Sequence, residues 1–155
     1  MCSSDLVLSA SSGITDKLLN ITNSLPEDVA TAKTIFKEVE AQTLEIVRKL
    51  EFSDSSTIKV TELLHELSQL IYSVELMEYI SDNVANRIVA YGEMLSTTIF
   101  SEYYNQSDTC IFLNITDYLT YDKKSDAYIL AKTVKIAQVL ETYKTIITQE
   151  RKRDV

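Results

Sequence analysis

Apolar residues recur at alternating steps of three and four through much of the chain, and this spacing predicts three long helices. The first has a narrow apolar seam with one polar member, and it consists of Val29, Ala32, Phe36, Val39, Thr43, Ile46 and Leu50. The second has Val60, Leu64, Leu67, Ile71, Val74 and Met77 on one face. The third begins near Ser81 and places Val84, Ile88, Tyr91 and Leu95 inward. Because a short polar segment separates the first two, we expect an antiparallel helical hairpin.

The pattern changes toward both ends of the chain, where short apolar or β-branched runs predict strands. The candidate strands are Leu6–Ala10, Cys110–Leu113 and Thr145–Thr148. Between the last two, Asp122–Asp126 is predicted to be a polar loop and Ala127–Leu140 a helix. This order favours an α/β fold, in which one mainly parallel sheet has residues 27–104 packed as a helical block at one side.

Composition narrows the class of protein and its partners. The chain has 155 residues, 45% of them hydrophobic, which suits a single domain over residues 1–155. Its formal net charge of −8 would repel nucleic acid, and no apolar run approaches the roughly 18 residues of a membrane span. We therefore expect a cytoplasmic protein with neither partner. Cys2 and Cys110 lack metal-ligand spacing, so no metal site held by protein side chains is expected.

Two segments contain both glycines of the chain and are candidates for chemistry. In Ser9–Thr15, small hydroxyl residues and Gly13 lie between a predicted strand and a helix, so backbone N–H groups could face an anion. The alternative is a tight turn whose serines, Ser11 among them, cap the helix. In the second segment, Gly92 interrupts a helical pattern at a cost of about 1 kcal/mol relative to alanine. Close approach of a ligand or of another backbone would explain it.

Beside Gly92, the Glu93 carboxylate could bind a cation such as a substrate ammonium. The alternative is a solvent-facing glutamate next to a glycine that serves only packing. The sole histidine, His65, has no predicted nucleophile partner and is expected at the surface.

The two segments together resemble aspartate kinases of the amino-acid kinase family. LSASSGIT at Leu8–Thr15 is similar to the motif in which a strand ending in Ser-Ala continues through Gly-(Ile/Val)-Thr into a helix. GEMLST, which begins at Gly92 and includes Ser96, resembles the family's Gly-Glu-x-x-Ser motif. Phe112–Asp122 and Ile146–Gln149 resemble two later segments of the same family. The resemblance is collinear from about residue 6 to residue 149.

The resemblance implies an α/β/α kinase domain that transfers the γ-phosphoryl group of Mg-ATP to the side-chain carboxylate of aspartate, the first step of lysine, threonine and methionine biosynthesis. It implies that Ser9 lies at the phosphoryl-transfer site, that Thr15 contacts aspartate, and that Glu93 holds the α-ammonium. Ser11, Gly13, Gly92 and Ser96 would support these residues. The partners that the resemblance implies are aspartate and ATP. A second copy of the chain, in a homo-oligomer, is a further candidate partner.

The sequence also departs from the family pattern. The family's lysine-bearing opening strand, its Gly-Arg-Gly-Gly segment and its regulatory ACT domains have no match, and residues 150–155 are off-pattern. We therefore expect an incomplete catalytic domain that is inactive in isolation. Two alternatives stay open, namely a non-catalytic remnant that binds a complementing kinase fragment and an unrelated helical binding module.

Overall fold

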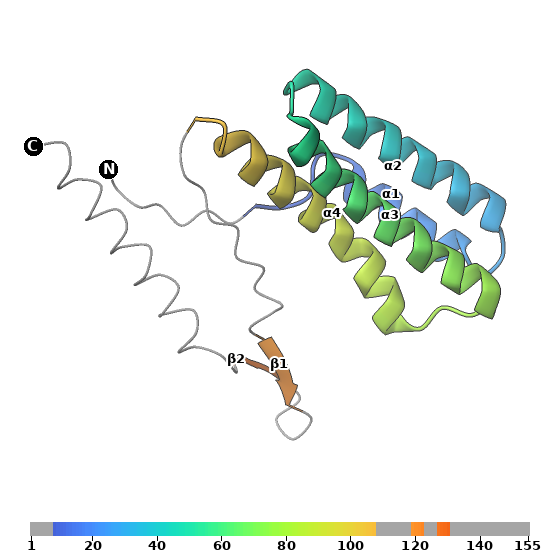
Figure 1. Cartoon of the computed structure of the whole chain (residues 1–155). Helices are drawn as coiled ribbons and strands as arrows, with labels where there is room; N and C mark the ends of the chain where they lie inside the picture. The colour runs from blue at the N-terminus through green and yellow to red at the C-terminus, as the bar shows by residue number, and fades with distance from the viewer. Residues whose placement is uncertain (1–7, 108–118, 123–126, 131–155) are drawn as a thin grey trace, which may run out of the picture. The chain divides into compact units, whose positions relative to one another are not determined.

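A computed structural model describes residues 8–107, 119–122 and 127–130, and the chain divides into two compact units, Met1–Phe112 and Leu113–Val155 (Figure 1). The first unit is a bundle of four helices, and the described part of the second is a pair of strands. The elements are α1 (Ile14–Ser24), α2 (Val29–Lys49), α3 (Asp54–Met77), α4 (Asp82–Tyr104), β1 (Leu119–Asp122) and β2 (Ala127–Leu130).

Capping side chains mark where the three long helices begin. The Asp28 carboxylate accepts a hydrogen bond from the Thr31 N–H at 3.0 Å and starts α2. Ser53 and Ser81 do the same for α3 and α4, accepting from backbone N–H groups three residues later. The α2 and α3 helices are followed by Glu51 and Glu78 in the left-handed conformation, with φ of 52° and 51°. Short connections between these points make neighbouring helices antiparallel (Figure 1).

The predicted seams largely become the core of the bundle. Val39, Thr43 and most of the predicted face of α3 are buried, and Thr43 satisfies its hydroxyl by donating to the Val39 carbonyl at 2.8 Å. Met77 differs from the prediction, because it lies at the last position of α3 and is 59% exposed. None of the described helices is long and apolar enough to cross a membrane.

The core has two parts that involve different helices. One part takes residues from all four helices and includes Ile14, Leu18 and Ile21 of α1. The other consists of Val47, Val60, Leu64, Leu95 and Ile99, which belong to α2, α3 and α4. The short helix α1 therefore completes only one half of the bundle.

The predicted α/β fold with a mainly parallel sheet is wrong for the described residues. Leu8–Ala10, expected at the end of the first strand, has no regular secondary structure. Its backbone meets helix α4 instead, since the Ser96 hydroxyl donates to the Ser9 carbonyl. The predicted strands at 110–113 and 145–148, and residues 6–7, lie outside the described residues.

The described strands form an antiparallel pair that the sequence analysis does not predict, since the predicted loop overlaps β1 only at Asp122 and β2 lies where a helix is predicted. Leu119 pairs with Leu130 and Asp122 with Ala127. Residues Ala127–Leu130, predicted as the first turn of a helix, form β2 because Tyr128 and Ile129 favour the extended backbone. A four-residue apolar run does not distinguish the two structures by its period.

Candidate functional site

The segment before α1 is a turn that depends on Gly13. Gly13 has φ of 76°, in the left-handed region that glycine adopts without steric cost, and it occupies the N-cap position of α1. No side chain caps this helix, and the Ile14 N–H is instead bonded to the backbone carbonyl of Ser11 at 3.0 Å. The alternative in which the serines of this turn cap the helix is therefore wrong. The first turn of α1 leaves the Thr15 N–H directed out of the helix end.

Gly92 lies where α4 passes closest to this segment. A Cβ atom on Gly92 would lie 3.0 Å from the Ala10 Cβ, 3.1 Å from Leu18 Cδ1 and 3.3 Å from Ile14 Cγ2. Gly92 is buried, so these neighbours form a packed contact between α4, α1 and the segment before it. All three neighbours are side-chain atoms, so Gly92 serves packing, and the Glu93 beside it is exposed. This agrees with the alternative stated from the sequence, a packing glycine next to a solvent-facing glutamate.

Ser96, one helical turn after Gly92, continues the same contact with a hydrogen bond. Its hydroxyl donates to the Ser9 carbonyl at 2.6 Å, which joins residues 87 positions apart. The two sequence segments singled out for chemistry thus lie against each other. Both segments also belong to the same unit, Met1–Phe112.

The remaining predicted site residues flank this contact. Ser9, Thr15 and Glu93 are exposed, and Ser11 is partly buried. Because Ile14 lies beside Gly92, Thr15 and Glu93 are each one Cα step, about 3.8 Å, from the contact. Within the described part of the chain, neither the Thr15 hydroxyl nor the Glu93 carboxylate has a hydrogen-bond or ion-pair partner. Their predicted roles in substrate binding stay predictions.

Gln42 and Lys17 contact the turn or lie beside it, and neither is among the site residues predicted from the sequence. Gln42 of α2 donates from Nε2 to the Ser12 carbonyl at 3.2 Å, and its Oε1 accepts from Lys17 Nζ at 3.3 Å. Lys17 also forms an ion pair with Glu38 at 3.2 Å. The turn is therefore attached to α2 as well as to α4. No local pattern marks Gln42, because its contact depends on how α1 and α2 pack.

The described residues do not fit Mg-ATP. None of them form a group of three acidic, histidine or cysteine side chains that could hold a metal ion. The cation next to the turn, Lys17, is paired with Glu38 rather than available to a phosphate. Phosphoryl transfer needs cations at the transferring group, so no step through ATP follows from these residues.

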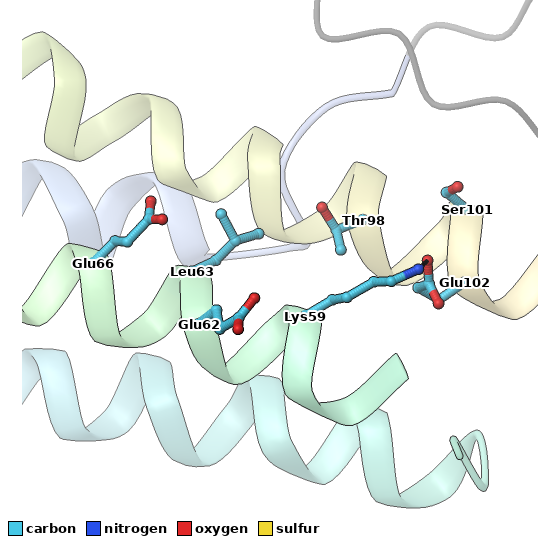
Figure 2. Close-up of a pocket in the computed structure, with 7 residues that line it drawn as sticks. All are labelled: Lys59, Glu62, Leu63, Glu66, Thr98, Ser101 and Glu102. Atoms are coloured by element: carbon cyan, nitrogen blue, oxygen red, sulfur yellow. Dashed lines mark hydrogen bonds and ion pairs between the residues drawn. The ribbon is translucent and has the colours of Figure 1, made fainter. Parts of the chain in front are cut away.

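A separate hollow of about 330 Å³ lies between α3 and α4 (Figure 2). It is lined by Lys59, Glu62, Leu63, Glu66, Thr98, Ser101 and Glu102. Lys59 Nζ contacts Glu102 Oε1 at 2.6 Å, and the Ser56 hydroxyl donates to Glu102 Oε2 at 2.8 Å. Burial acts to raise the pKa of Glu102, but the hydrogen bonds from Lys59 and Ser56 and the Lys59 charge outweigh it and lower the pKa below 4.5. This group links the two helices.

A second hollow of about 430 Å³ lies farther along the same two helices. It is lined by His65, Glu66, Gln69, Leu70, Ser73, Arg87 and Tyr91. His65 is exposed, as expected from the sequence. The Tyr91 hydroxyl donates to Glu66 at 3.1 Å, and burial together with this hydrogen bond and the Glu66 charge raises the pKa of Tyr91 above 10. None of the seven predicted site residues lines either hollow.

Comparison of the sequence with protein-family models gave no match, and comparison with curated proteins gave none either.

Proposed function

We propose that this chain contains the aspartate-binding portion of an aspartate kinase-like enzyme. The observation that supports the proposal is the contact between its two motif segments, in which Gly92 packs on Ala10 and Ser96 bonds to Ser9. Such a contact would bring a carboxylate, a hydroxyl and a helix N-terminus to one place. The proposal rests on this contact and on the resemblance, and it does not depend on the sheet that the sequence had predicted.

The exposed groups beside the contact suit a small zwitterion. The Glu93 carboxylate has no cationic partner among the described residues, so it is free to accept an ammonium group. On the other side, the N-terminus of α1 has no side-chain cap, and its N–H groups favour a carboxylate. In this proposal the α-ammonium of aspartate binds at Glu93 and a carboxylate binds near Thr15.

Aspartate binding to the purified 155-residue chain tests the proposal. Loss of a charge-assisted hydrogen bond costs about 1.5–3 kcal/mol, so Glu93→Gln should weaken binding by about ten- to a hundredfold. Glu62→Gln is the matched control, because Glu62 is another exposed glutamate without a partner in the described region, and it should leave the affinity unchanged. Isothermal titration calorimetry would measure both.

Succinate separates the role of the ammonium group from general carboxylate binding, since it lacks that group. Glu93→Gln should weaken aspartate binding and leave succinate binding as it was. No ATP turnover is expected from the chain in either case, because Lys17 is held by Glu38 and the turn Ser9–Thr15 itself contains no lysine or arginine. Failure of the unchanged chain to bind aspartate saturably would refute the proposal.

A helical binding module is the second candidate, and one observation favours it. Four large apolar side chains are at least half exposed at the end of α3 and in the turn after it, namely Tyr72, Leu76, Met77 and Tyr79. An exposed apolar cluster of this kind often marks a contact with another protein. This candidate would be favoured over the first if the unchanged chain bound a partner protein but not aspartate, and if Leu76→Ser abolished binding of that partner.

A further inference from the structure

The hydroxyl of Ser96 differs from its neighbours in where it donates. A serine hydroxyl has one proton, and in a helix it usually donates back to a carbonyl three or four residues earlier. The Ser96 hydroxyl lies 3.2 Å from the Glu93 carbonyl of its own helix but only 2.6 Å from the Ser9 carbonyl. The shorter distance identifies Ser9 as the main acceptor.

Thr97 provides the contrast that makes this arrangement informative. Its hydroxyl donates to the Glu93 carbonyl at 2.7 Å and approaches the Met94 carbonyl at 3.1 Å, both within α4. The Glu93 carbonyl is thus satisfied without Ser96. Two adjacent hydroxyl residues therefore have different tasks, one within the helix and one across to the segment before α1.

The segment that Ser96 holds has few other attachments. Residues 8–10 have no regular secondary structure, and the described part of the chain gives them no backbone-to-backbone hydrogen bond. Gln42 reaches only the later Ser12 carbonyl. Ala10 contacts Gly92 through van der Waals packing, which fixes distance but not orientation. Ser96 is therefore the polar group that orients the Ser9 peptide.

We propose that Ser96 is a positioning residue, which holds the Ser9 carbonyl so that the turn from Ser9 to Thr15 keeps a fixed place relative to Glu93. This inference rests on the proposed function, since it is the aspartate site whose two sides Ser96 joins. Ser96 does not itself touch the substrate. Without its hydroxyl, the turn samples more orientations, and a ligand bound between the turn and Glu93 must order it on binding.

Ser96→Ala, Thr97→Ala and Ser96→Thr form the test set. NMR of the full chain would record the carbonyl ¹³C shift of Ser9, which responds directly to the loss of a hydrogen bond, and the backbone order parameters of Ala10–Ser12. In Ser96→Ala we expect the Ser9 shift to change and the order parameters to fall from about 0.85 toward 0.6. Thr97→Ala should leave both unchanged. Ser96→Thr keeps the hydroxyl, so both should stay near their values in the unchanged chain.

Aspartate affinity gives the functional readout. A neutral hydrogen bond contributes about 0.5–1.5 kcal/mol, so Ser96→Ala should weaken aspartate binding about two- to tenfold while Thr97→Ala does not. Circular dichroism would check that each variant keeps its helices. An unchanged Ser9 carbonyl shift and unchanged order parameters in Ser96→Ala would overturn the positioning role. Absence of aspartate binding in the unchanged chain would instead overturn the proposed function, so the two failures are distinguishable.

Discussion

Replacing Gly92 by alanine sets two effects of opposite sign against each other. In a helix interior, alanine is favoured over glycine by about 1 kcal/mol, so helix propensity alone predicts that Gly92→Ala stabilises the protein. The new methyl group, however, would lie 3.0 Å from the Ala10 Cβ and 3.1 Å from Leu18 Cδ1. Leu18 is fully buried, so it has little room to move. Crowding in a packed core costs about 1–3 kcal/mol.

We expect crowding to exceed the gain in propensity, with a net loss of about 1 kcal/mol in the free energy of unfolding. Urea denaturation followed by far-ultraviolet circular dichroism would measure it by linear extrapolation. The helical signal suits this purpose, because the four helices of the described residues all belong to one unit.

Ala10→Gly supplies the matched control, since it removes the atom nearest to the new methyl group. In a double-mutant cycle, Gly92→Ala should cost less in the Ala10→Gly background than in the unchanged chain. Relief should be partial, because Leu18 and Ile14 still crowd the site. The packing argument would be refuted if Gly92→Ala raised the free energy of unfolding by about 1 kcal/mol and showed no coupling to Ala10→Gly.

Two further predictions concern pH. The interactions that lower the pKa of Glu102 in the folded protein stabilise the fold above pH 4.5, where the carboxyl is ionised in both folded and unfolded chains. This stabilisation is lost as the pH falls through the folded-state pKa. The stability difference between the unchanged chain and Glu102→Gln should therefore shrink between about pH 6 and about pH 3 in urea denaturation, and a constant difference would contradict it. The raised pKa of Tyr91 gives stability that is present below pH 10 and lost as the pH rises through the folded value. Glu66→Gln should lower that pKa in an ultraviolet absorbance titration, with Tyr91→Phe identifying the step; an unchanged titration would show that Glu66 does not act on it.

The sequence predicted those features of the bundle that depend on local spacing. The faces of α3 and α4 follow from a repeat of three and four residues, and Ser81, near which the third helix is predicted to begin, caps α4. Gly92 was also informative, because a glycine that weakens a helix needs a compensating contact. In each case, the physical cause lies within a few residues of the feature.

The errors arose where tertiary contacts decide the structure. Leu8–Ala10 is predicted as the end of a short strand, yet the backbone carbonyl of Ser9 is bonded to a side chain of α4. The sequence pattern of Ala127–Leu130 predicts a helix, although its pairing with β1 makes it a strand. Gln42 was missed because its bond to Ser12 spans 30 residues. No local pattern carries such information.

Because α1 packs in only one of the two parts of the core, the candidate site persists only while α1 stays packed on the bundle. Detaching α1 would expose Ile14, Leu18 and Ile21, but it would leave the apolar contacts around Leu64 and Leu95 in place. A partly open state that retains α2, α3 and α4 thus costs less than complete unfolding. In such a state Thr15 and the turn before it are no longer held against α4, so a ligand at this site binds only the state in which α1 is packed. Saturating ligand should then slow hydrogen exchange most strongly in α1, and by less in the half of the bundle that α1 does not reach.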